Sequence, residues 1–397
     1  MRAGKDILGY LSAHQQDMLD LLEQLVLMES PTDVATSQGP VLDRLQQELT
    51  ILDYRSIRIP ARHFGGQLYA RPEKTAPHGR KRTPRQLLLG HCDTVWPVGT
   101  LETMPVTLDP QTGIMRGPGI YDMKAGLVEI IFALRALKEF RLSPDVTPMI
   151  FINSDEELGS RESAPYIRRL ARCVDRALVM EPSLGPEGRL KTARKGVGRF
   201  TVTVKGKAAH AGLDPGAGAS AILELSHVIQ KLFALNDPDR GASVNVGLID
   251  GGVRANVVAP ESTAIVDVRV ENQEDAYAIE QAIHGLRAET PGVTLEIQGR
   301  IGRPPMEPTP ANRQLWTLAR ALGEELTLPL EEGTAGGGSD GNTTSLYTAT
   351  LDGLGAVGDG AHAANEHIEV SQLPGRCALL AMLLLAPPLV PERIGKP

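Results

Sequence analysis

Short apolar runs alternate with segments of helical periodicity over about the first 190 residues. Three of these runs are typical of buried strands: QLLLG (86–90), PMIFIN (148–153) and RALVM (176–180). Between the first two, the segment KAGLVEIIFALRALKEF carries apolar residues at helical spacing. Such alternation is typical of βαβ units, so the sequence predicts an α/β fold with a mixed, largely parallel sheet flanked by helices. At the start of the chain, apolar positions from Ile7 to Leu25 predict one amphipathic helix.

The order of elements changes in the middle of the chain. Between residues 195 and 302 it is βαββαβ, with strands near 200–206, 243–249, 262–270 and 293–299 and helices near 217–235 and 274–288. This order matches the ferredoxin-like split unit, which can fold as a domain of its own. A chain of 397 residues is also longer than one ordinary hydrophobic core requires. We therefore predict a catalytic domain made of two parts, 1–194 and 303–397, with residues 195–302 inserted between them.

Charge and cysteine content narrow the class of protein. The net charge of -7 argues against nucleic-acid binding, which needs a dense Lys/Arg surface. The three cysteines, Cys92, Cys173 and Cys377, share no close spacing and favour a reducing compartment over a disulfide framework. The first residues lack the continuous apolar core of a signal peptide, and no apolar run is long enough to cross a bilayer. We expect a cytoplasmic protein with no membrane partner.

Polar clusters directly follow the predicted strands. His91 and Asp93 lie in GHCDTV after the first strand, the acids of NSDEELGS follow the second, and Glu181 follows the third. The segment GPGIYDMKAG places Asp122 before a helix, and GDGAHAANEH places His362 in a glycine-rich turn. Because ligands bind beyond the carboxyl ends of parallel strands, we expect these clusters to converge.

Each cluster has a second interpretation when taken by itself. His91 could be a hydrogen-bonded loop histidine, Asp122 an N-cap, and residues 155–157 a solvated acidic turn. Three adjacent acids, however, raise one another's pKa values unless a cation offsets their charge. Two imidazoles with several carboxylates suit zinc or a similar divalent ion.

Taken in order, these motifs resemble those of the dizinc aminoacylase and glutamate carboxypeptidase superfamily. That superfamily also includes acetylornithine and succinyl-diaminopimelate deacylases and several dipeptidases. The resemblance runs over nearly the whole chain, from the first helix to HAANEH. It implies a zinc-exopeptidase-like domain whose ferredoxin-like insertion serves as a dimerisation or lid domain, and hence a homodimer formed through the insertion.

The resemblance also implies two zinc ions per subunit and a role for each motif residue. The ligands would be His91 and Glu181 for one ion, Glu157 and His362 for the other, and Asp122 as the bridge between them. Asp93 would fix the orientation of the His91 ring. Glu156 would be the general base that generates a metal-bridging hydroxide for attack on the amide carbonyl. His210, in KGKAAHAG, would reach the active site of the other subunit and stabilise the oxyanion.

Four further residues match substrate-binding positions of the glutamate carboxypeptidase branch: Arg189, Asn256, Arg269 and Arg303. The segment GGGSD resembles a substrate-facing loop of the superfamily, in which Gly337 and Gly338 would let the backbone approach a ligand closely. An arginine fork binds a carboxylate bidentately, so a substrate with two carboxylates fits this set. Other interpretations stay open. Arg269 could instead pair with Asp267 or Glu271 on an edge strand, Arg303 could be a hinge residue, and GGGSD could be a flexible connector.

The expected activity is a zinc-dependent carboxypeptidase-type hydrolysis. It would release a C-terminal residue, glutamate or aspartate, from a small peptide or an N-acyl amino acid. An N-acyl amino acid deacylase or a dipeptidase would use the same metal centre. Acidic loops would also suit a phosphohydrolase with one zinc or magnesium ion, and the same fold could persist in a binding protein that has lost activity. The presence of every motif residue favours an active enzyme.

Overall fold

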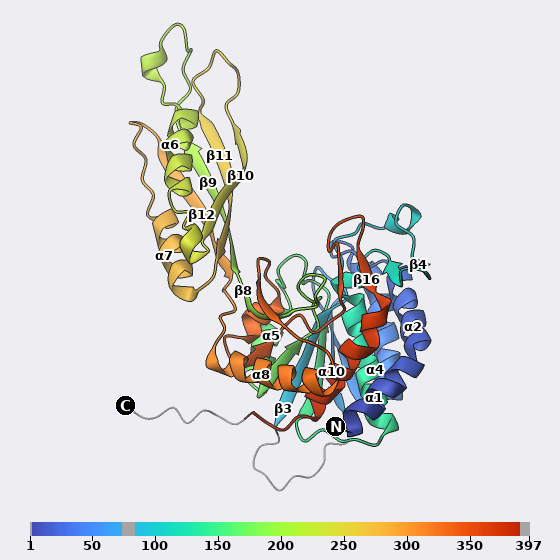
Figure 1. Cartoon of the computed structure of the whole chain (residues 1–397). Helices are drawn as coiled ribbons and strands as arrows, with labels where there is room; N and C mark the ends of the chain where they lie inside the picture. Colours follow the sequence, from blue (N-terminus) through green and yellow to red (C-terminus); the bar gives the residue numbers. More distant parts are fainter. Residues whose placement is uncertain (1, 74–83, 390–397) are drawn as a thin grey trace, which may run out of the picture. The chain divides into compact units, whose positions relative to one another are not determined.

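The computed structural model describes residues 2–73 and 84–389, and the chain divides into two compact units (Figure 1). The first unit comprises Met1–Thr192, Pro308–Thr334 and Ser339–Pro397, and the second comprises Ala193–Glu307 with Ala335–Gly338. The insertion expected at 195–302 lies within the second unit. Within the described ranges, no helix combines the length and the apolar character that crossing a membrane requires.

The central sheet of the first unit has six strands in the order β1-β2-β6-β3-β7-β14. Their bounds are β1 Tyr54–Ile59, β2 Gln67–Pro72, β3 Arg85–His91, β6 Thr147–Asn153, β7 Arg176–Val179 and β14 Ala349–Leu351. Strand β3 pairs in parallel with β6 and β7, and β14 pairs in parallel with β7. Strands β1 and β2 add an antiparallel edge. This arrangement confirms the predicted mixed, largely parallel sheet.

Helices cover both faces of this sheet. They are α1 Arg2–Ala13, α2 Gln15–Leu27, α3 Gly39–Ile51, α4 Ala125–Glu139, α5 Ala164–Ala171, α8 Pro310–Glu325, α9 Asp340–Thr344 and α10 Leu373–Leu385. On one face, Leu88 and Ile150 join the large core that contains Leu380 of α10. On the other face, Phe151 packs in a smaller core with Ile167 of α5. Because both faces are covered, β3 and β6 are buried along nearly their whole length and carry the uninterrupted apolar runs LLL and PMIFI.

The N-terminal segment forms two helices, α1 and α2, where one was predicted. The backbone at His14 (φ -106°, ψ 19°) leaves the helical region and separates them. There, Nδ1 of His14 lies 2.8 Å from the carbonyl oxygen of Tyr10, and the two rings stack with centroids 4.1 Å apart. The apolar positions still face the core, because Ile7, Leu11 and Leu25 are fully buried.

Two small sheets were not predicted from the sequence. One has the order β15-β16-β5-β4, and the other pairs β13 with β8. Their bounds are β4 Thr107–Asp109, β5 Ile114–Arg116, β15 Gly358–Asp359, β16 His367–Glu369, β8 Leu190–Arg194 and β13 Glu332–Ala335. Strands this short offer too few residues for an alternating pattern to be recognised. The pairing of β16 with β5 brings the segment that contains His362 beside the segment that leads to Asp122.

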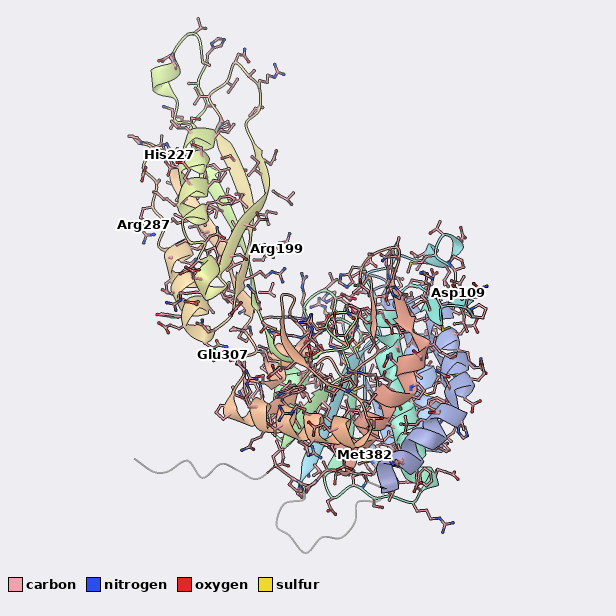
Figure 2. All side chains as sticks on the ribbon, in the orientation of Figure 1. Asp109, Arg199, His227, Arg287, Glu307 and Met382 are labelled. Atoms are coloured by element: carbon pink, nitrogen blue, oxygen red, sulfur yellow. The ribbon has the colours of Figure 1, made fainter. Side chains whose placement is uncertain are left out.

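The second unit is a four-stranded antiparallel sheet with two helices. Its elements are β9 Gly196–Lys205, α6 Ala221–Phe233, β10 Ser243–Gly251, β11 Glu261–Val270, α7 Gln273–His284 and β12 Thr294–Arg303. The strand order β10-β11-β9-β12 is that of the ferredoxin-like fold, as predicted. Burial alternates along β9, where Phe200 is buried in the core while Arg199 projects from the sheet (Figure 2). This period of two is the pattern of a strand with one covered face.

Candidate metal centre

Five segments of the first unit meet beyond the carboxyl ends of its parallel strands. His91 is the last residue of β3, Glu157 follows β6, and Glu181 follows β7. Asp122 lies in the irregular turn Ile120–Lys124 before α4, and His362 lies between β15 and β16. All five lie close together, as the ion-pair distances below establish. The topology of a parallel sheet accounts for this convergence of residues that are distant in sequence.

The carboxylate of Asp122 lies between two groups of side chains. Its Oδ1 is 3.2 Å from Nε2 of His91, and that same nitrogen is 3.6 Å from Oε1 of Glu181. Its Oδ2 is 3.3 Å from Nε2 of His362, which is 3.1 Å from Oε2 of Glu157. Each oxygen of Asp122 therefore faces one imidazole and one further carboxylate. Such a carboxylate is placed to bridge two cations.

The donor atoms fit divalent cations. Candidate ligand atoms of His91, Asp122 and Glu157 all lie within 4.8 Å of one another, and so do those of His91, Glu156 and Glu181. Oε1 of Glu157 is buried and has no hydrogen-bond partner among the described residues, so a lone pair is left for a ligand. Imidazole nitrogens with carboxylate oxygens are the donors that zinc and similar ions prefer. Glu156, which was expected to be the general base, therefore also lies close to His91 and Glu181.

The acids and imidazoles of this site shift one another's pKa values. Hydrogen bonds to Asp122 and Glu157 raise the pKa of His362 to about 10. Burial alone would lower the pKa of His91, but hydrogen bonds to Asp122 and Asp93 raise it well above its usual value. Burial alone would raise the pKa of Asp122, but hydrogen bonds from the two histidines hold it well below its usual range. Without metal, protons on the imidazoles therefore supply the positive charge that these carboxylates need.

Asp93 connects the His91 side of the site to the acidic loop. Its carboxylate is fully buried, and Oδ1 lies 3.4 Å from Nδ1 of His91. The same carboxylate accepts the backbone N–H groups of Glu156 (3.3 Å) and Glu157 (3.1 Å) and the hydroxyl of Thr32 (2.8 Å). Asp93 thus fixes both the imidazole ring of His91 and the backbone of Glu157.

Local geometry decides between the alternative interpretations of Asp122 and of the acidic run 155–157. Asp122 is not an N-cap, because the N-cap of α4 is Lys124. Asp155 points away from the other two acids of its run and accepts the backbone N–H groups of Glu162 (2.7 Å) and Ser163 (3.1 Å) ahead of α5.

One buried acid beside the site, Glu366, was not predicted from the sequence. It is fully buried and binds the Asp122 loop. Its position in HAANEH gave no sign of this, since its partners come from two distant segments.

The remaining candidate residues divide between the two units. Arg189 belongs to the first unit, where its Nε lies 3.8 Å from Oε2 of Glu187. The others, His210, Asn256, Arg269, Arg303, Gly337 and Gly338, belong to the second. An added Cβ at Gly337 would meet no atom within 4 Å, so the chain itself does not require glycine there.

His210 is exposed and has a defined tautomer. Its Nδ1 accepts the backbone N–H groups of Gly212 and Leu213, each at 3.2 Å. Since Nδ1 is an acceptor, the proton of the neutral ring lies on Nε2, which is then a donor. The neighbouring loop contains Asn256, whose carbonyl oxygen accepts the N–H of Ala211 at 3.0 Å. The two candidate residues therefore occupy adjacent loops.

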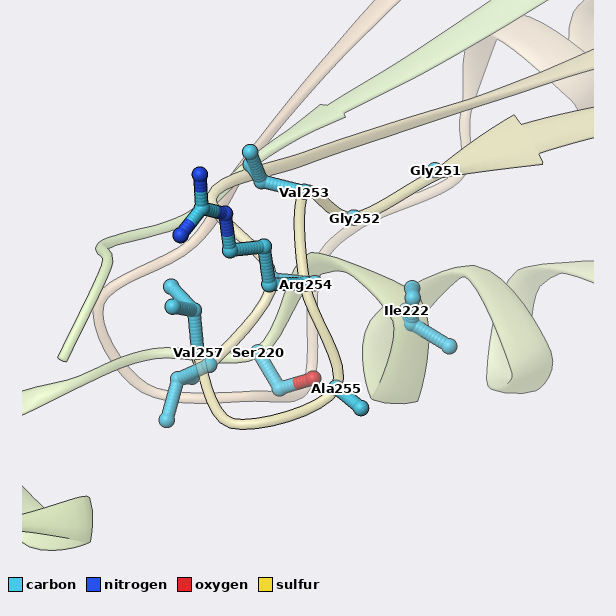
Figure 3. Close-up of a pocket in the computed structure, with 10 residues that line it drawn as sticks. Ser220, Ile222, Gly251, Gly252, Val253, Arg254, Ala255 and Val257 are labelled. Atoms are coloured by element: carbon cyan, nitrogen blue, oxygen red, sulfur yellow. The ribbon is translucent and has the colours of Figure 1, made fainter. Parts of the chain in front are cut away.

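A hollow of about 570 Å³ opens between the loop that contains Asn256 and the start of α6 (Figure 3). Its lining is mainly backbone and apolar side chains, with Ser220 and Arg254 as the polar exceptions. Elsewhere in the unit, Arg269 makes a bidentate pair with Asp267, at 2.8 and 3.0 Å, so the pairing that the sequence left open is present. The strand that carries this pair, β11, is central, however, and not at the edge of the sheet.

The chain is similar to metallopeptidases over most of its length. The peptidase family described as M20/M25/M40 matches residues 87–386. Carboxypeptidase G2 of Pseudomonas sp. (strain RS-16) is 27% identical over 383 residues, covering 94% of this chain and 89% of that protein. Succinyl-diaminopimelate desuccinylase of Xanthomonas oryzae pv. oryzae is 28% identical over 325 residues, with 78% and 85% covered.

A solved structure shares the fold at lower identity. It is the YXEP protein of Bacillus subtilis, described as a dinuclear metal binding peptidase from the M20 family. The two chains superpose with a TM-score of 0.66 at 15% identity, covering 94% of this chain and 98% of that one.

Binding of zinc to the metal-free protein should release more than one proton per subunit at pH 7. His362, with its pKa raised to about 10, must lose its proton before Nε2 can bind a cation, and burial raises the pKa of Glu157 to about 8. At pH values below these two pKa values, protons compete with zinc for His362 and Glu157. The apparent affinity for zinc should therefore rise with pH. Calorimetric titration in buffers of different ionisation enthalpy measures the protons released. Release of fewer than one proton per subunit at pH 7 would contradict the raised pKa values of His362 and Glu157.

Proposed function

Because the chain belongs to peptidase family M20/M25/M40, we propose that it is a two-zinc carboxypeptidase-type hydrolase that releases C-terminal glutamate or aspartate. Family membership establishes the metallopeptidase class, and the similarity to carboxypeptidase G2 supports the exopeptidase direction. The observation that carries the two-metal proposal is the carboxylate of Asp122, whose two oxygens face different imidazoles.

In the proposed mechanism, His91 and Glu181 would hold one ion, Glu157 and His362 would hold the other, and Asp122 would contribute to both. Two divalent ions at such a site lower the pKa of water and polarise the scissile carbonyl. Glu156, buried beside these ligands, accepts the proton of the attacking water and returns it to the leaving nitrogen. Its burial supports this role, because a base that is shielded from solvent passes its proton to the substrate.

We expect Glu156→Ala to keep two zinc ions while kcat falls by about 10²–10⁴-fold, because the variant lacks only the proton acceptor. Glu157→Ala is the matched control on the adjacent residue, and it should lose one ion as well as activity. Metal content after dialysis and initial rates give both quantities. If Glu156→Ala lost an ion, Glu156 would be a ligand, which its position near His91 and Glu181 would also allow.

The substrate is proposed to be held by residues of the second unit. The Nε2–H of His210 is an exposed donor suited to the developing oxyanion. Arg303, at the end of β12, would bind the α-carboxylate, with Asn256 as a further polar contact. Arg269 would contribute only if a substrate carboxylate replaced Asp267. The backbone at Gly337 and Gly338 belongs to the same proposed set, and Arg189 of the first unit is proposed as a further substrate-binding residue.

A panel of N-acyl and N-peptidyl amino acids with varied C-terminal residues tests the substrate class. We expect the highest kcat/KM for glutamate or aspartate. Arg303→Ala should lower kcat/KM for free carboxylates by roughly 10-fold or more, as expected for the loss of a charged hydrogen bond, and should affect amidated analogues much less. Arg300→Ala, an exposed arginine on the same strand, is the control. Equal losses on free and amidated substrates would remove Arg303 from carboxylate binding.

The same panel separates the competing functions. The similarity to a succinyl-diaminopimelate desuccinylase supports an N-acyl amino acid deacylase as the second candidate. Such an enzyme would prefer short acyl groups and tolerate many amino acids, whereas a dipeptidase would require a free amino group in the substrate.

We also propose a homodimer formed through the second unit. Its edge strand β10 exposes Leu248 (62%) and Ile249 (67%), and an exposed apolar edge is suited to pairing with a second copy. Ile249→Lys should therefore halve the mass measured by light scattering. Ile57→Lys, on the exposed edge strand β1 of the first unit, is the control and should leave the mass unchanged. A wild-type monomer at micromolar concentration would exclude the dimer.

A further inference from the structure

A single buried carboxylate, that of Glu366, collects four hydrogen bonds next to the candidate metal centre. Its Oε1 accepts the backbone N–H groups of Tyr121 (2.9 Å) and Asp122 (3.0 Å). Its Oε2 accepts the N–H of Gly119 (3.0 Å) and the indole Nε1–H of Trp96 (2.7 Å). The side chain has no exposure to solvent. Four donors on one carboxylate match the number of its lone-pair sites.

The backbone of the turn is shaped to bind an anion. Gly119 adopts a left-handed conformation (φ 72°), and a Cβ at this position would collide with Thr94. The turn directs three N–H groups within four residues toward the same point, which is a concave donor site of the kind that binds anions. A carboxylate satisfies all of these donors. A glutamine amide would direct its own N–H₂ group at one pair of them.

Glu366 joins three segments that the proposed mechanism uses. Asp122 lies in the turn it binds, and His362 lies four residues earlier on its own segment. Trp96 follows the His91–Asp93 segment at the end of β3. Asp93 connects His91 to the acidic loop in a comparable way. The two buried carboxylates thus hold the ligand loops from different sides.

We propose that Glu366 is a positioning residue that sets the distance between Asp122 and His362, and so the affinity of the ion held by His362, Glu157 and Asp122. This inference rests on the two-metal site proposed above. Asp122 receives the constraint directly, through its own backbone N–H. The His91 side has Asp93 as its own anchor, so the loss of Glu366 should weaken the two ions unequally.

The chain offers a matched control for a merely structural effect. Glu29 is half-buried and also accepts two backbone N–H groups, those of Gly99 (2.8 Å) and Leu101 (3.0 Å). The loop it binds carries no candidate ligand. Glu29→Gln therefore perturbs the same kind of interaction without touching the metal centre.

The test is titration of metal-free wild type, Glu366→Gln and Glu29→Gln with Zn²⁺ in competition with a chromophoric chelator, and with Co²⁺ followed by its absorption spectrum. Wild type and Glu29→Gln should bind two ions with the same affinities. Glu366→Gln should bind one ion about 10- to 100-fold more weakly, the usual loss when a group that orients a metal ligand is removed, and should show an altered Co²⁺ spectrum.

The outcomes separate this inference from the proposed function. Two ions bound by Glu366→Gln as tightly as by wild type would overturn the inference and leave the two-metal proposal standing. Fewer than two ions bound by wild type would overturn both. If Glu366→Gln does not fold, Trp96→Phe decides, because it removes one of the four donors and keeps the carboxylate. It should weaken the same ion by a few-fold, and an unchanged affinity would refute the positioning role.

Discussion

The concentration of buried carboxylates at one edge of a parallel sheet is the constraint on which the rest of the first unit depends. Like charges at close range in a poorly solvated site repel strongly, so each carboxylate must be matched by a donor or a cation. Asp93 and Glu366 are matched by backbone N–H groups. Asp122 is matched by imidazoles that carry protons when no metal is present, and burial raises the pKa of Glu157 to about 8, so that it keeps a proton of its own at pH 7. The candidate site therefore suits cations, which can take the place of those protons.

The fold supplies this concentration through topology. Strands β3, β6 and β7 are adjacent and parallel, so the loops that follow them emerge at the same edge. Strand β14, which comes after the second unit in sequence, joins this sheet beside β7. The last part of the chain is thereby anchored to the first, and the β15–β16 segment can deliver His362 to loops that lie on the other side of the insertion in sequence.

The features that the sequence could predict differ in physical origin from those that it could not. Buried strands were predictable because both faces of the sheet are covered, which leaves long apolar runs such as PMIFIN. The loops that carry the candidate ligands His91, Glu157 and Glu181 were predictable because they begin where those runs end, whereas Asp122 and His362 lie in glycine-rich turns that follow none of these runs. The short strands β15 and β16 have no periodicity to detect, and the role of Glu366 depends on donors such as Trp96, 270 residues away in sequence. Interactions that depend on several distant segments at once leave no pattern in any one of them.

Adjacent acids in the run 155–157 show how backbone geometry assigns different roles to similar side chains. Asp155 turns toward the start of α5, where it accepts backbone N–H groups, and Glu157 turns toward His362. Glu156 lies near His91 and Glu181 instead. Because Asp93 binds the N–H groups of both Glu156 and Glu157, their directions are set together. The proposed base Glu156 and the proposed ligand Glu157 can therefore be neighbours in sequence without competing for one position, provided that the carboxylate of Asp93 stays in place.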